Sequence, residues 1–142
     1  MRHGTVLLAD RHSPMLEAVR DLLEGCFEAV IMVADESSLF QAVDKLQPAC
    51  VVVDVSFPCS AGPSENVVSL LHKRLPSLKL IVLSVHDERV VAERVLELGA
   101  AGFVLKRSAV TELLPAIDAV LLGGTYVSPG VHPPLGSKND RV

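Results

Sequence analysis

Short runs of β-branched and aliphatic residues alternate with segments of helical periodicity through the first 124 residues of this chain. Five of these runs have the length of a strand, and each is followed by apolar residues spaced three or four positions apart. The predicted strands are Thr5–Ala9, Ala29–Val33, Cys50–Val53, Leu78–Leu83 and Gly102–Leu105. Strands that alternate with helices form a parallel sheet with helices on both faces and right-handed crossovers. The sequence therefore predicts a doubly wound α/β fold of five βα units.

Capping residues and prolines predict where the helices begin and end. The predicted N-caps of the first four helices are Ser13, Asp35, Ser64 and Asp87. Gly99 stands where helices commonly end in glycine. Pro115 lies among the apolar residues of the last helix, and a proline in a helix interior costs about 3 kcal/mol. We therefore expect that helix to begin late, near Thr111, with Pro115 at the edge of its first turn.

Residues 1–124 are predicted to form one domain, and residues 125–142 a C-terminal tail or truncated linker. The chain is 49% hydrophobic, which is typical of a packed globular protein and not of a disordered one. From Tyr126 onward, however, proline and glycine recur among few apolar residues. Such a composition is typical of linkers and termini.

Charge, hydropathy and cysteine content narrow the class of protein. The formal net charge of −4 gives no basic footprint for nucleic acid or an anionic membrane. No apolar run approaches the roughly 18–20 residues that span a bilayer, and the first residues do not resemble a signal peptide. Cys26, Cys50 and Cys59 have no metal-ligand spacing and suit a reducing cytoplasm. We expect a cytoplasmic protein that binds neither membrane nor nucleic acid directly.

Polar side chains follow four of the five predicted strands. Asp10, Asp54, Ser84 and Lys106 stand at the carboxyl ends of the first, third, fourth and fifth strands. Each alone also fits a strand-end cap, a turn or a surface charge, but in doubly wound sheets these ends converge on one ligand-binding crevice. One carboxylate can form an aspartyl phosphate and another can hold Mg²⁺, while an ammonium and a hydroxyl contact phosphoryl oxygens. Together they predict a site that handles a phosphoryl group.

Four segments resemble the receiver domain of bacterial response regulators. They are Val6–Asp10, the Asp-x-x-x-Pro-x-x-x-Gly spacing of Asp54–Gly62, Ile81–Ser84, and the Gly-Ala-x-Gly-aromatic-x-x-Lys run of Gly99–Lys106. The resemblance covers nearly all of residues 5–131 and implies a flavodoxin-like (βα)5 fold with strand order 2-1-3-4-5. Gly123–Pro129 is similar to the NarL/FixJ-type subfamily of LuxR-family regulators, in which it leads to a helix-turn-helix domain. No such domain follows here, so we expect a stand-alone receiver or one cut from a longer chain.

Carried over by position, the resemblance implies a role for each strand-end residue. Asp54 would be the phosphoacceptor, and a sensor histidine kinase or a phosphotransfer protein would supply the phosphoryl group. Ser84 would be the switch hydroxyl that turns toward the phosphoryl group. Phe103 would be the switch aromatic, although an aromatic at a strand end also fits simple core packing. Lys106 would pair with the phosphoryl group.

One position departs from the family's pattern, because Asp10 is followed by Arg11 where receivers carry a second acid. The resemblance implies a Mg²⁺ site on Asp10, Asp54 and the backbone carbonyl of Ser56, and a nearby guanidinium would repel the metal by several kcal/mol at an effective dielectric of about 20. Three arrangements stay open. Arg11 turns to solvent beside a weakened metal site, occupies the metal position and pairs with Asp54, or assists a bound phosphoryl group without metal. The second would make a pseudo-receiver, an interaction module independent of phosphorylation and metal.

The resemblance also implies how the protein interacts with partners and which activities it lacks. Two copies would pair through the first and last helices, Pro14–Glu24 and Thr111–Leu122, and phosphorylation would switch a protein-interaction surface in transcription regulation. The chain would be no enzyme beyond self-catalysed phosphotransfer and dephosphorylation. A flavodoxin-like enzyme or nucleotide binder is a third interpretation, but no G-x-G-x-x-G or P-loop pattern follows the first strand.

Overall fold

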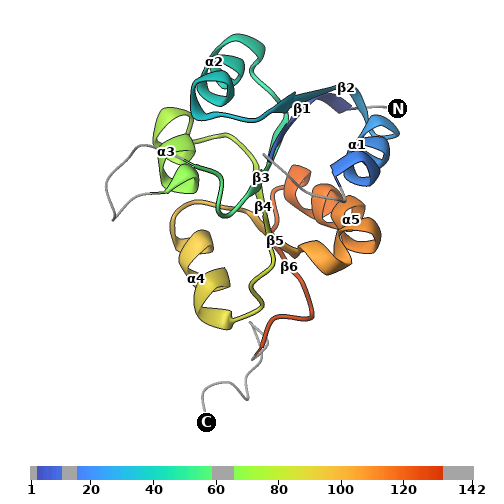
Figure 1. The fold of residues 1–142 in the computed structure, drawn as a ribbon, viewed down its shortest axis with the longest axis vertical. Coiled ribbons are helices and arrows are strands. Elements are labelled where there is room, and N and C mark those ends of the chain that lie inside the picture. The colour runs from blue at the N-terminus through green and yellow to red at the C-terminus, as the bar shows by residue number, and fades with distance from the viewer. Residues whose placement is uncertain (1–2, 11–15, 59–65, 133–142) are drawn as a thin grey trace.

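The computed structural model describes residues 3–10, 16–58 and 66–132, and these contain one parallel sheet in the order β2-β1-β3-β4-β5-β6 (Figure 1). The strands are β1 His3–Ala9, β2 Phe27–Val33, β3 Cys50–Asp54, β4 Leu80–Ser84, β5 Gly102–Leu105 and β6 Tyr126–Val127. The helices are α1 Leu16–Glu24, α2 Glu36–Leu46, α3 Val67–Arg74, α4 Arg89–Glu97, α5 Ala109–Leu121 and a 3₁₀ turn, Lys106–Ser108. The predicted fold class and the order 2-1-3-4-5 are confirmed, with one further strand at the β5 edge.

Two apolar cores lie on the two faces of the sheet. Helices α2, α3 and α4 cover one face, and α1 and α5 cover the other (Figure 1). Successive side chains of a strand point to opposite faces. Leu7 accordingly packs in the first core, whereas Val6 and Leu8 pack in the second. Burial on both faces explains why β3, β4 and β5 are almost entirely apolar and do not alternate with polar residues.

The N-caps of the helices confirm one prediction and correct another. Asp35 caps α2, and its carboxylate accepts a hydrogen bond from the backbone N–H of Ser38 at 2.7 Å. The residue before α4 is Glu88, which makes no side-chain capping bond, so the predicted cap on Asp87 is wrong. The Asp87 carboxylate instead faces Arg107 at 3.4 Å. The predicted caps Ser13 and Ser64 lie outside the described residues. Helix α3 begins at Val67, and its N-cap Asn66 forms a reciprocal capping box with Ser69.

Helix α5 begins at Ala109, earlier than the predicted start near Thr111, and it contains Pro115 in its interior. The late start was inferred from the cost of an interior proline. Burial of Leu113 and Ile117 on the sheet-facing side of α5 offsets that cost, since full burial of one such side chain contributes roughly 1.5–3 kcal/mol. Tertiary packing thus overrides local propensity in this helix.

The prediction of an unstructured tail from Tyr126 onward is wrong for residues 126–132. Tyr126 and Val127 form β6, paired in parallel with Gly102 and Phe103 of β5. Val131 is fully buried in the core that α4 covers. The ordered chain therefore extends past the predicted boundary at residue 124, because strand pairing and one buried valine hold a segment of linker-like composition. Residues 133–142 lie outside the described part.

Gly99 occupies a turn in which both the backbone conformation and the surrounding space require glycine. Its φ is +121°, and a Cβ at this position would lie 2.5 Å from Cγ of His72. We expect Gly99→Ala to lower the free energy of unfolding by about 2 kcal/mol or more, since backbone strain and overpacking add. Urea denaturation measures the difference. Gly4→Ala is the matched control, because nothing lies within 4 Å of an added Cβ there. Equal losses in the two variants would contradict the prediction.

Candidate functional site

Three of the predicted strand-end residues form one charged cluster at the carboxyl edge of the sheet. Asp10 follows β1, Asp54 ends β3 and Lys106 follows β5. The Lys106 ammonium lies 3.4 Å from Oδ2 of Asp10 and forms an ion pair with Oδ2 of Asp54. Asp10 and Asp54 are each 7% exposed, and the Lys106 side chain is 15% exposed. Because the cluster is largely shielded from water, its charges interact more strongly than a surface pair would.

The Asp54 carboxylate is held at both oxygens. Oδ1 accepts hydrogen bonds from the backbone N–H and the side-chain hydroxyl of Ser56, both at 2.7 Å, while Oδ2 pairs with Lys106. Burial alone raises the pKa of Asp54, but the hydrogen bonds from Lys106 and Ser56 outweigh it and hold the pKa below its ordinary value. The carboxylate is therefore ionised at neutral pH.

The hydroxyl of Ser56 is a contact that the sequence analysis missed. The prediction gave this residue only a backbone carbonyl. An aspartate commonly accepts hydrogen bonds from the residue two positions later, and serine adds a second donor there. The spacing of Asp54 and Ser56 could therefore have predicted the hydrogen bond from the Ser56 hydroxyl to the Asp54 carboxylate.

Ser84 and Phe103 are both buried, but neither joins the charged cluster. 

The Ser84 hydroxyl accepts a hydrogen bond from the backbone N–H of His86 at 2.8 Å and donates one to the carbonyl of the same residue at 3.2 Å. In the described part of the chain, no hydrogen bond joins Ser84 to Asp54 or Lys106. Phe103 is fully buried in the core beneath α4. The predicted switch hydroxyl therefore faces the β4–α4 loop, and the predicted switch aromatic lies in the core.

The donor atoms of the crevice fit Mg²⁺ in kind. Mg²⁺ binds proteins through one or two carboxylates and keeps its other positions for phosphate oxygens and water. Asp10 and Asp54 would supply two carboxylates, and Ser56 would supply a backbone carbonyl. Within residues 3–10, 16–58 and 66–132, no three or more His, Cys, Asp or Glu side chains gather around a common metal position. Arg11, the atypical position of the sequence, lies outside these ranges.

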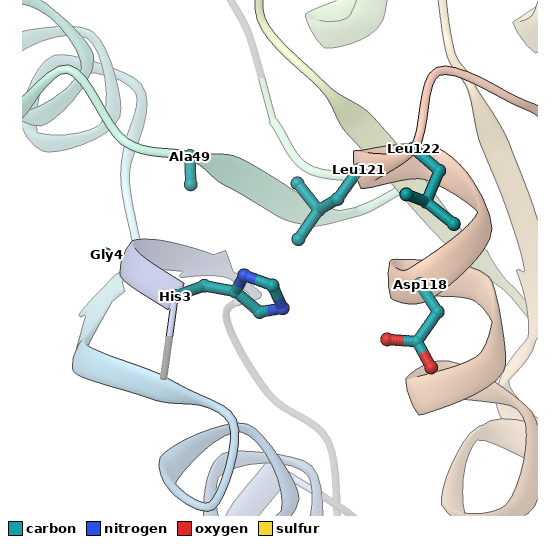
Figure 2. Close-up of a pocket in the computed structure, with 6 residues that line it drawn as sticks. All are labelled: His3, Gly4, Ala49, Asp118, Leu121 and Leu122. Atoms are coloured by element: carbon teal, nitrogen blue, oxygen red, sulfur yellow. The ribbon is translucent and has the colours of Figure 1, made fainter. Parts of the chain in front are cut away.

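A cavity of about 560 Å³ lies at the opposite edge of the sheet, where the strands begin (Figure 2). His3 and Gly4 of β1 line one side, and Asp118 and Leu122 near the end of α5 line the other. None of the strand-end residues contributes to its lining. The cavity is therefore separate from the charged crevice.

Among the described residues, no helix has the length and apolar character needed to cross a membrane.

Comparisons with known proteins agree on the family of this chain. A family model described as the response regulator receiver domain matches residues 6–118. The transcriptional regulatory protein DegU of Brevibacillus brevis is 31% identical over 128 residues, which cover 89% of this chain and 53% of DegU. The transcriptional regulatory protein MctR of Rhizobium johnstonii is 34% identical over 134 residues, which cover 92% of this chain and 61% of MctR. The chain thus spans between half and two thirds of the length of these relatives.

A solved structure matches along almost its whole length. The isolated receiver domain of RcsB from Salmonella enterica serovar Typhimurium, in the presence of the phosphomimetic BeF₃⁻, superposes with a TM-score of 0.76 and 26% identity. The match covers 92% of this chain and 96% of that domain. The family model, which covers most of the chain, and the matching fold show that the chain belongs to the receiver domains of two-component response regulators.

Proposed function

We propose that this receiver domain accepts a phosphoryl group on Asp54 from a partner histidine kinase or phosphotransfer protein, and that the modification switches a protein-interaction surface. The observation that carries the proposal is the joint pairing of Lys106 with Asp10 and Asp54 at the carboxyl edge of the sheet. This cluster combines an ionised nucleophile, a second carboxylate and a cation in one crevice, as phosphoryl transfer requires.

The transfer follows from the charges around Asp54. A carboxylate oxygen attacks the phosphorus of a phosphohistidine, the new P–O bond forms as the P–N bond breaks, and the electron pair of that bond leaves with the imidazole. Lys106 then pairs with a phosphoryl oxygen in place of the carboxylate charge. Mg²⁺ held by Asp10, Asp54 and the carbonyl of Ser56 would neutralise further phosphoryl charge. Ser56 keeps Asp54 oriented through its two hydrogen bonds.

Incubation with acetyl phosphate, with and without Mg²⁺, tests the proposal. We expect the intact mass to rise by a single phosphoryl group in the presence of Mg²⁺, and peptide mapping to place the group on Asp54. An unchanged mass under both conditions would contradict phosphorylation. It would favour the second candidate, a pseudo-receiver that binds partners without phosphate or metal, which the Asp10-Arg11 pair motivates.

Substitution of Arg11 provides a separate test, which concerns the affinity for Mg²⁺. Arg11→Asp restores the acid that the family carries at this position and exchanges a repulsive charge for an attractive one. We expect it to tighten Mg²⁺ binding by about tenfold or more, since it exchanges repulsion of the metal for attraction at the position next to Asp10 in the chain. Titration calorimetry measures the change, and Arg20→Asp on α1 is the control for net charge. Equal affinities in wild type and Arg11→Asp would refute the charge argument.

We also propose a cytoplasmic location and pairing of two copies through α1 and α5. These helices lie side by side on one face of the sheet (Figure 1). Sedimentation before and after treatment with acetyl phosphate tests the pairing.

A further inference from the structure

The segment Tyr126–His132, here called the strap, joins the β5 edge of the sheet to the start of α4. Its first residues form β6 beside β5. The backbone N–H of Ser128 donates to the carbonyl of Phe103 at 2.9 Å, and the Ser128 hydroxyl accepts from the N–H of Leu105 at 2.9 Å. The same hydroxyl donates to the Glu112 carboxylate on α5. The strap is therefore bonded along the whole of β5, the strand that leads to Lys106.

The far end of the strap is bonded to the β4–α4 loop. The backbone N–H of His132 donates to the carbonyl of Asp87 at 2.8 Å, and its carbonyl accepts from the N–H of Arg89 at 3.0 Å. Between the two ends, Val131 is fully buried in the core with Phe103. The strap thus fixes the loop that follows Ser84 against the strand that precedes Lys106.

Arg107 adds a second connection between the crevice and the strap. It follows Lys106 directly, and its guanidinium lies 3.4 Å from the Asp87 carboxylate. A Cβ on Gly130 would lie 2.9 Å from an Arg107 nitrogen and 2.9 Å from a Leu105 methyl group. The strap therefore passes directly beside Arg107, and the absence of a side chain at Gly130 makes room for this arrangement.

Ser84 ends β4, which pairs with the strand that ends at Asp54, and it precedes the loop that the strap holds. A serine hydroxyl has one proton to donate, and Ser84 donates it to the carbonyl of His86. If that proton is donated to a phosphoryl oxygen on Asp54, the bond to His86 is lost. His86 lies next to Asp87, whose carbonyl and carboxylate hold the strap and Arg107. Binding of a phosphoryl group and docking of the strap therefore favour different arrangements of the β4–α4 loop.

We propose that the strap is docked while Asp54 is unmodified and leaves its site when Asp54 carries a phosphoryl group. The inference rests on the proposed function, because it describes how phosphorylation of the crevice is transmitted. Undocking exposes the edge of β5 and the core around Phe103, and it frees residues 126–132. By linkage, anything that weakens strap docking strengthens binding of a phosphoryl analogue by the same factor.

Tyr126 reports on the strap, because the chain has one tyrosine and no tryptophan. Burial, and then the charge and hydrogen bonding of Glu112, raise the pKa of its phenol. A carboxylate partner quenches tyrosine emission, so undocking should raise it. We expect addition of BeF₃⁻ with Mg²⁺ to raise Tyr126 fluorescence and to speed hydrogen exchange at the amides of His132 and Arg89. Asp54→Asn should abolish both responses.

Val131→Ala tests the linkage. It removes part of the buried anchor of the strap, and we expect it to tighten BeF₃⁻ binding by about fivefold or more, the lower range of common allosteric couplings. Val19→Ala is the matched control, since Val19 is equally buried but lies on α1 in the other core. Its affinity should equal that of wild type.

The results of these experiments distinguish a failure of the strap inference from a failure of the proposed function. If BeF₃⁻ binds by calorimetry while Tyr126 emission, exchange at His132 and the affinity of Val131→Ala are unchanged, the strap inference is overturned and phosphorylation stands. If wild type neither binds BeF₃⁻ nor gains mass from acetyl phosphate, the proposed function fails and the strap inference fails with it. A tighter Val131→Ala together with an unchanged Val19→Ala supports the strap.

Discussion

Lys106→Met is expected to lower the free energy of unfolding by about 3 kcal/mol at pH 7, since loss of one partner from a buried ion pair leaves uncompensated charge. Two carboxylates of low exposure, Asp10 and Asp54, pair with this single ammonium. This value is at the lower end of the usual cost of breaking a buried ion pair, because the Lys106 side chain is still 15% exposed. Methionine keeps the length and apolar stem of lysine. Guanidinium denaturation in Mg²⁺-free buffer measures the loss.

The pH dependence of the difference in unfolding free energy between wild type and Lys106→Met identifies the cause of that difference. Burial lowers the pKa of Lys106, but hydrogen bonds and charge from Asp54 and Asp10 outweigh it, so the pKa lies above its ordinary 10.5. The pKa of Asp54 lies below its ordinary 3.8. The stabilisation is therefore complete between the two ordinary values, is lost as pH falls through the depressed pKa of Asp54, and is lost as pH rises through the raised pKa of Lys106. The gap between wild type and variant should narrow in acid.

Lys45→Met provides the control for Lys106→Met. Lys45 is exposed in the last turn of α2, so its replacement should change the free energy of unfolding by no more than about 0.5 kcal/mol. If Lys106→Met unfolds at the same guanidinium concentration as Lys45→Met at pH 7, Lys106 does not compensate the two carboxylates.

Asp54→Asn is expected to abolish phosphorylation by acetyl phosphate while leaving the fold intact. The amide has no anionic oxygen to attack phosphorus. Its carbonyl can still accept the hydrogen bonds from Ser56, and Lys106 keeps Asp10 as a partner. We therefore expect a change of less than about 1 kcal/mol in the free energy of unfolding, well below that of Lys106→Met. Intact mass and thermal denaturation read the two effects separately.

Asp21→Asn is the matched control for this substitution. Asp21 lies on α1 with a side chain that is 70% exposed, so its loss should leave the mass gain unchanged. A full mass gain in Asp54→Asn would move the acceptor to another residue, with Asp10 as the first to examine.

The charged crevice could be predicted because topology alone brings strand ends together. Asp10, Asp54 and Lys106 follow runs that are buried on both faces, and such runs are recognisable in a single sequence. The direction of the Ser84 side chain could not be predicted in this way. It depends on a rotamer that the backbone of His86 stabilises, and serine hydroxyls form such local bonds only weakly, so the sequence does not fix the choice.

The strap and the start of α5 escaped prediction for a shared reason. Local composition argued against order at Tyr126 and against a helix around Pro115, and local propensity is a weak prior. In both places long-range packing decides the outcome, through pairing with Phe103 for β6 and through burial of Ile117 for α5. Neither contact can be seen within a window of neighbouring residues.

The short strand β6 also bears on how the protein is best handled in solution. Without it, β5 would be the last strand, and its unpaired N–H and C=O groups would form a template for association with other chains. A fragment that ends at residue 124 would remove β6 and Val131 together. Such a fragment is expected to aggregate during purification, whereas one that extends through His132 keeps the edge covered. Expression boundaries should therefore be set beyond residue 132.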